Sequence, residues 1–130
     1  MILQTTLSLA AAAAILNVWI MIRVSALRVS GKVIHGDGGN AALMKRMRAH
    51  ANFVENVPLA LILIAAIEIS AKGGLWLSVW GGVFMLARIA HAFGMDGTSA
   101  NKLRMIGTII TMLTQLGLAI VAILISMGVI

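Results

Sequence analysis

The chain has 130 residues, of which 61% are hydrophobic and 11% are charged, whereas a soluble domain is about half apolar and about a quarter charged. This composition excludes an ordinary soluble domain and predicts a single domain surrounded by lipid. We assign the net charge of +6 to basic loops against anionic lipid headgroups, and expect no nucleic-acid binding. The absence of cysteine excludes disulfides and cysteine-ligated metals, so any thiol would have to arrive on a ligand.

Four membrane-spanning helices are expected, at about residues 3–26, 42–70, 75–94 and 101–128. A bilayer core of about 30 Å needs about 20 helical residues. The first apolar run is read as a retained span, because no basic segment precedes it as in a signal peptide. The two middle runs, residues 59–67 and 75–87, are too short alone, so their helices must include polar residues. We therefore expect an all-α integral membrane protein, a four-transmembrane-helix bundle.

The connecting segments are expected to be loops and turns. Residues 28–40 contain four glycines and no apolar period, which is typical of a loop. In residues 70–74, glycines are expected to end the second helix. Residues 94–101 form another turn, in which Ser99 or Asn101 is available to cap the fourth helix.

Lysine and arginine are unevenly divided among these loops, and this predicts the orientation. They gather around the first loop and flank the third, whereas the second contains only Lys72. The positive-inside rule then makes loops one and three cytoplasmic and places both termini outside.

Polar side chains recur at helical spacing on three of the predicted helices. Arg48, Asn52 and Glu55 are spaced i, i+4 and i+7, which places them on one helix face. A second stripe, on the third helix, contains Arg88, His91 and Met95. A third stripe, on the fourth helix, contains Arg104, Thr108, Thr111 and Gln115.

Glu55 and Arg88 are expected at a similar depth in the membrane, since Glu55 lies seven residues, or roughly 10 Å, beyond Arg48. Each charge alone costs about 2.5–3.5 kcal/mol to insert, so we hypothesise that the two form an ion pair. Such a pair either only joins two helices or contributes to a polar pocket open to the cytoplasm. We favour the pocket, whose excess of cations implies an anionic ligand, because other polar residues converge at the same end: Arg48, Asn52, His91 and Arg104. No HxxxH or HExxH spacing occurs, so we expect no metal site.

Three motifs together resemble those of a known membrane family. The segment RAHANFVENVP resembles the signature of the MAPEG superfamily, the membrane-associated proteins in eicosanoid and glutathione metabolism: an arginine, an asparagine four residues on, a glutamate three further and then a proline. The segment RIAHAFG resembles the third-helix motif of the family, and Arg104 matches an arginine near the start of its fourth helix. The resemblance implies a homotrimer with glutathione bound between neighbouring subunits near the cytoplasmic side.

Site residues follow from the resemblance by position. It implies that Arg48, Asn52, Glu55 and His91 hold glutathione, with Arg88 supporting Glu55. Arg23 stands near the first-helix arginine of the family, and Arg104 would face and stabilise the thiolate.

The resulting hypothesis is a bacterial inner-membrane, glutathione-dependent transferase or peroxidase. It would act on lipophilic electrophiles or lipid hydroperoxides that enter from the surrounding membrane lipids. One alternative is a non-catalytic protein of the same fold that binds lipid or another ligand. A further alternative is a small proton-coupled efflux transporter, which would need a titrating glutamate that the arginines around Glu55 disfavour.

Overall fold

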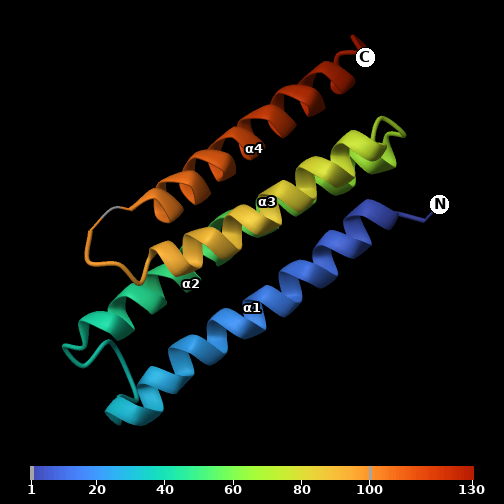
Figure 1. Cartoon of the computed structure of the whole chain (residues 1–130). Helices are drawn as coiled ribbons and strands as arrows, with labels where there is room; N and C mark the ends of the chain where they lie inside the picture. Colours follow the sequence, from blue (N-terminus) through green and yellow to red (C-terminus); the bar gives the residue numbers. More distant parts are fainter. Residues whose placement is uncertain (1, 100) are drawn as a thin grey trace.

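The computed structural model describes residues 2–99 and 101–130 and contains four helices (Figure 1). They are α1 (Gln4–Gly31), α2 (Ala41–Ile69), α3 (Leu75–Gly94) and α4 (Lys102–Ser126). Each is long and apolar enough to cross a membrane. The predicted all-α architecture with four candidate spans is therefore confirmed.

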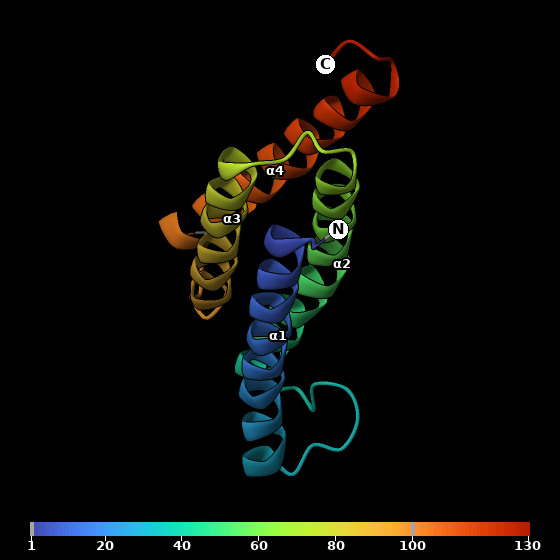
Figure 2. The ribbon, with the colours of Figure 1, turned by 90° about the vertical axis from the view of Figure 1, so that its right-hand side faces the viewer.

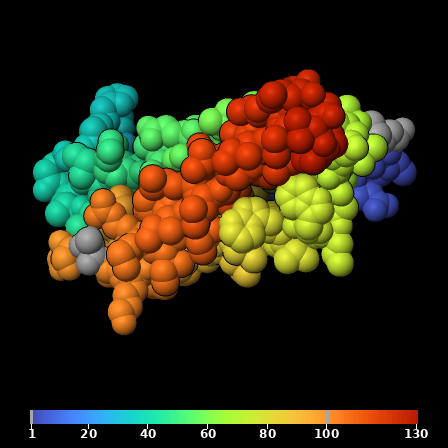
Figure 3. Space-filling model, turned by 90° about the horizontal axis from the view of Figure 1, so that it is seen from above, coloured from blue at the N-terminus to red at the C-terminus, as the bar shows by residue number. Residues whose placement is uncertain are grey.

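The inner helices are α2 and α3, each of which contacts all the others. Within the described residues, α1 and α4 do not contact each other, and Figure 2 shows α4 slanting away from α1. Buried side chains from all four helices form the core, including Ile20, Ile64, Phe84 and Leu118. Seen from above, α4 lies on the outside of the bundle across α2 and α3 (Figure 3).

Two glycines allow α3 and α4 to approach closely. A Cβ atom at Gly107 of α4 would lie 2.5 Å from the His91 Cβ and 2.8 Å from the Ala87 carbonyl oxygen. A Cβ atom at Gly94, the last residue of α3, would lie 2.3 Å from the Arg104 backbone nitrogen. Only a residue without a side chain fits at these positions, so the polar stripes of the two helices are held side by side.

Several helix ends differ from the expectation. α1 continues to Gly31, through part of the segment predicted as a loop, and it ends there because Lys32 adopts φ 55° and its N–H bonds back into the last turn. α2 ends at Ile69, and Ala71, not a glycine, adopts the left-handed conformation with φ 60°. The glycine at position 74, with φ 123°, instead precedes α3.

The third turn contains the expected cap. The Asn101 side chain accepts a hydrogen bond from the Arg104 backbone at 3.0 Å, which satisfies one of the free N–H groups at the start of α4. Residue 100, within the same predicted turn, lies outside the described residues.

Candidate functional site

Arg88 is the centre of a buried polar cluster between three helices. Its side chain is only 2% exposed, although it lies in a membrane-spanning helix. Its Nη1 donates to Thr111 Oγ1 of α4 at 3.0 Å, and its Nη2 donates to Asn52 Oδ1 of α2 at 2.6 Å. The guanidinium carbon also lies 5.9 Å from the centre of the Phe53 ring. We call Asn52, Arg88 and Thr111 the Arg88 cluster.

The predicted ion pair between Glu55 and Arg88 is wrong for the single chain. Among the described residues, the ion pairs are those of Asp96 with Arg23 and with Arg46, and Glu55 is exposed. The physical reason is helix rotation: three residues on from Asn52, a side chain points about 60° away around the helix axis and lies about 4.5 Å further along. Asn52 therefore reaches Arg88 while Glu55 faces outward.

The remaining predicted residues divide between the interior and the surface. His91 lies one turn after Arg88 and is 3% exposed. Its Nδ1 and the Arg88 Nε are buried and have no hydrogen-bond partner within the described chain. Arg48 and Arg104 are exposed. The structure thus brings Asn52, Arg88 and His91 to one region, and the assignment of all these residues to ligand binding stays a prediction.

A second polar contact between α2 and α4 continues the cluster toward the membrane interior. Gln115 Nε2 donates to Asn56 Oδ1 at 2.8 Å, and Asn56 Nδ2 donates to the Asn52 carbonyl at 2.7 Å. Beside Gln115, an apolar groove of about 670 Å³ runs between α2 and α4 and includes Leu59, Leu63 and Met112 in its lining. Polar side chains and an apolar groove therefore lie next to each other between α2 and α4.

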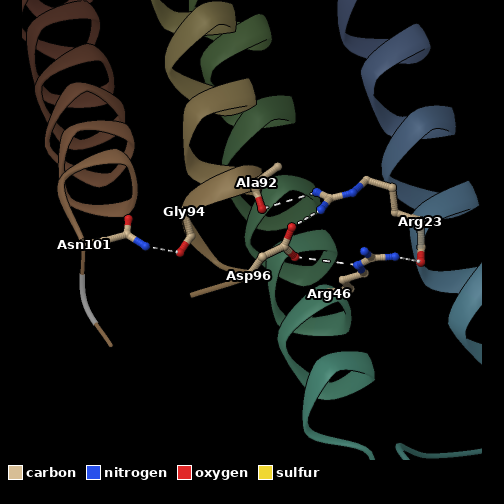
Figure 4. A network of polar contacts seen from close by, with 6 residues as sticks. All are labelled: Arg23, Arg46, Ala92, Gly94, Asp96 and Asn101. Carbon is tan, nitrogen blue, oxygen red and sulfur yellow. Dashed lines mark hydrogen bonds and ion pairs between the residues drawn. The ribbon is translucent and has the colours of Figure 1, made fainter. Parts of the chain in front are cut away.

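Arg23 lies in a different cluster, at the end of the bundle where α3 connects to α4 (Figure 4). Its guanidinium bonds to Asp96 and to the Ala92 carbonyl, and lies over the Trp19 and Phe93 rings at 4.9 and 5.2 Å. The position of Arg23 therefore differs from that of the Arg88 cluster, with which sequence reasoning had grouped it as a glutathione ligand.

Arg46 and Asp96 were missed at the level of sequence. Arg46 Nε lies 3.6 Å from Asp96 Oδ1, and Arg46 Nη1 donates to the Arg23 carbonyl at 2.9 Å. We call Arg23, Arg46 and Asp96 the Asp96 bridge. One feature of the sequence could have indicated this contact. Asp96 is the sole acidic residue of the segment 94–101, and this segment is predicted on the same side of the membrane as the strongly basic first loop.

Glu68, also missed, fastens the opposite end of the bundle. Its Oε1 accepts from the Thr5 backbone at 2.9 Å, and its Oε2 accepts from the Thr6 backbone and hydroxyl at 2.8 and 2.7 Å. The residue before α1 provides no side-chain cap, so a carboxylate from α2 satisfies free N–H groups at the start of α1. Glu68 therefore has a structural role.

Four apolar helices, three of which enclose a buried arginine, define the class of the protein, a helical membrane protein with a polar site inside the bundle. Residues 6–124 match the model of the MAPEG family. The chain belongs to the MAPEG family, as the three sequence motifs indicated.

The chain is also similar to curated bacterial proteins. It is 32% identical over 68 residues to the inner membrane protein YecN of Escherichia coli strain K12, and equally to YecN of strain O6:H1. The match covers 52% of this chain and 52% of each relative, so the chain spans about half the length of the curated relatives it matches. No solved structure matches this chain. The name of these relatives agrees with a membrane location and specifies no activity.

Proposed function

We propose that the chain is a glutathione-dependent membrane transferase or peroxidase that acts on lipophilic electrophiles or lipid hydroperoxides. The observation that supports this most directly is the Arg88 cluster, in which a buried guanidinium is held only by neutral oxygens within the described chain. Because no carboxylate of residues 2–99 and 101–130 pairs with Arg88, the region keeps a positive charge. A buried cation without a counter-ion favours an anionic ligand.

Glutathione suits the residues around this cluster. It has two carboxylates, which arginine side chains such as Arg48 bind through paired N–H donors, and an ammonium group, which Glu55 can accept. Its thiol reacts as the thiolate. Arg104 stands in the first turn of α4, where the helix dipole adds positive potential. Arg104 therefore stabilises the thiolate in the proposed reaction.

The outward charges on α2 favour assembly into the homotrimer that the family resemblance implies. Arg48, Glu55, Ile62 and Ile69 are all exposed and are spaced by seven residues, so they form one stripe along α2. Charged side chains facing hydrocarbon are costly and need a polar partner. A second copy of the chain covers this stripe and completes the glutathione site between subunits.

The lipophilic substrate is proposed to bind in the groove between α2 and α4. Its lining is almost entirely apolar, with Leu116 and Ala119 beside Gln115. In the bundle, Gln115 is connected through Asn56 to the backbone of Asn52. A substrate that enters from the lipid would therefore reach the polar cluster along this groove. The proposed location is the bacterial inner membrane, with loops one and three in the cytoplasm and both termini outside.

The test is conjugation of glutathione to a chloronitrobenzene, or reduction of a lipid hydroperoxide, by the purified protein. Removing one electrostatic group from a reaction site typically costs about a hundredfold or more in rate, so we expect Arg104→Ala to lose about that much. Lys102→Ala is the matched control, because Lys102 is exposed on the same helix turn. Absence of turnover in the wild type, or equal rates in both variants, would contradict the proposal.

A proton-coupled transporter is the second candidate, and one observation favours it. Glu55 has no ion-pair partner within the described chain, as expected of a carboxyl group that titrates during transport. Substrate uptake into vesicles that depends on a proton gradient and is abolished by Glu55→Gln would select transport. Stabilisation by glutathione without either activity would select the non-catalytic binding protein.

A further inference from the structure

The Asp96 bridge connects three parts of the chain that are distant in sequence (Figure 4). Asp96, in the loop after α3, bonds to Arg23 of α1 and pairs with Arg46 of α2. The two arginine side chains are partly enclosed, with exposed fractions of 13% for Arg23 and 28% for Arg46, whereas Asp96 is exposed at 37%. One carboxylate shared between two guanidiniums from different helices fixes the loop more firmly than a single exposed pair, because charge networks exceed isolated surface pairs in strength.

The first turn of α4 is attached to the same loop. Asn101 Oδ1 accepts from the Arg104 backbone at 3.0 Å, and Asn101 Nδ2 donates to the Gly94 carbonyl at 2.9 Å. The Gly94 backbone packs directly against the Arg104 backbone, with no space for a side chain at Gly94. Since α1 and α4 do not touch in the described parts of the chain, this loop adds a direct connection from the start of α4 to α1, beside the packing of α4 on α2 and α3.

We propose that Asp96 is a positioning residue for Arg104. By holding the α3–α4 loop against α1 and α2, it fixes the first turn of α4 and thus the place where the Arg104 side chain begins. The Arg104 side chain is exposed, so little packing fixes it, and its position follows from that of its backbone. Electrostatic stabilisation of a developing anion requires a cation that is already in place. The inference rests on the proposed function, in which Arg104 stabilises the thiolate.

The first experiment measures the position of α4 without glutathione. Because the chain has no cysteine, spin labels can be attached only at introduced ones, here Leu103→Cys on α4 and Met44→Cys on α2, both exposed. Labelled chains are diluted with unlabelled chains so that distances within one chain dominate. We expect Asp96→Asn to broaden the distance distribution and Asp96→Glu to restore it. Asp37→Asn, the same charge change in the first loop, should leave it narrow.

The second experiment separates kcat from KM for glutathione conjugation. A small misplacement of a catalytic group costs up to about a hundredfold in rate, so we expect Asp96→Asn to lower kcat about tenfold. KM for glutathione should change by less than about twofold, because Asp96 pairs with Arg23 and Arg46 and not with Arg48 or Glu55, to which the proposed function assigns the charged groups of glutathione. In the Arg104→Ala background, Asp96→Asn should lower kcat no further, since the cation that it positions is absent.

An unchanged distance distribution in Asp96→Asn overturns the inference. So does an additive loss of kcat in the double variant, because it would show that Asp96 acts independently of Arg104. A wild type that fails to turn over glutathione contradicts the proposed function instead. The distance measurement then still decides whether Asp96 fixes the start of α4.

Discussion

At the scale of single residues, Arg88 shows how a membrane helix accommodates a charge that has no ion-pair partner among the described residues. Its two outer nitrogens donate to an amide oxygen on α2 and to a hydroxyl on α4. Hydrogen bonds to a charged donor are stronger than neutral ones, and a buried partner is costly to lose. Arg88 thereby joins three helices at one depth.

The first prediction concerns these partners. Mutations of neighbours in one hydrogen-bond network have interaction energies of about 0.5–3 kcal/mol, whereas the effects of mutations at unlinked sites are additive. We expect Asn52→Ala and Arg88→Gln to be coupled in a double-mutant cycle of the free energy of unfolding in detergent. Glu55→Gln and Arg88→Gln should be additive in the same measurement. If the first pair were additive and the second coupled, the result would contradict this arrangement and support an ion pair between Glu55 and Arg88.

Spacing along the sequence placed Asn52, Arg88 and Thr111 on the polar faces of three helices but did not show which groups would meet. A helical period gives the face that each residue shares, whereas partner choice depends on how one helix is rotated against the next. Glu55 was assigned to Arg88 from their opposite charges and similar depth, without the rotation of the helices. Asp96 was missed because a loop has no period from which its contacts can be read.

At the scale of helices, the close crossing of α3 and α4 determines whether the polar stripes face each other. Gly107 allows it, because the His91 Cβ and the Ala87 carbonyl occupy the space that its side chain would need. The sequence showed a glycine in an apolar helix but not that α3 would pack against it. Helix length and charge indicated the spans, and the terminal residues depended on local conformations such as that of Lys32.

The second prediction follows from that crossing. Overpacking a well-filled contact costs typically about 1–3 kcal/mol, so Gly107→Ala should lower the free energy of unfolding by that amount and reduce glutathione-dependent activity. The control is Gly117→Ala, on the same helix, where a Cβ atom would meet nothing within 4 Å. Alanine is the better helix former by about 1 kcal/mol, so this control should be neutral or stabilising in thermal unfolding. Equal effects at both positions would show that the crossing is not tight.

At the scale of the whole molecule, the chain is a bundle whose polar groups are split between its interior and its surface. Composition and four apolar segments were sufficient to predict the membrane class and the helix count, because lipid requires continuous apolar helices. The outward position of Arg48, Glu55 and Arg104 could not be derived from one chain's periodicity. In the proposed trimer these three side chains meet a neighbouring subunit, where the ligand binds.

The most direct test of this account is an equilibrium titration of glutathione into the purified protein in detergent. We predict saturable binding by the wild type, and a loss of at least about tenfold in affinity for Arg48→Ala, because a charge-assisted carboxylate contact contributes about 1.5–3 kcal/mol. Lys72→Ala, which removes the same charge from the second loop, should bind as the wild type does. Absence of saturable binding, or equal affinity in the two variants, would contradict the claim that the polar residues of α2, α3 and α4 form a glutathione site.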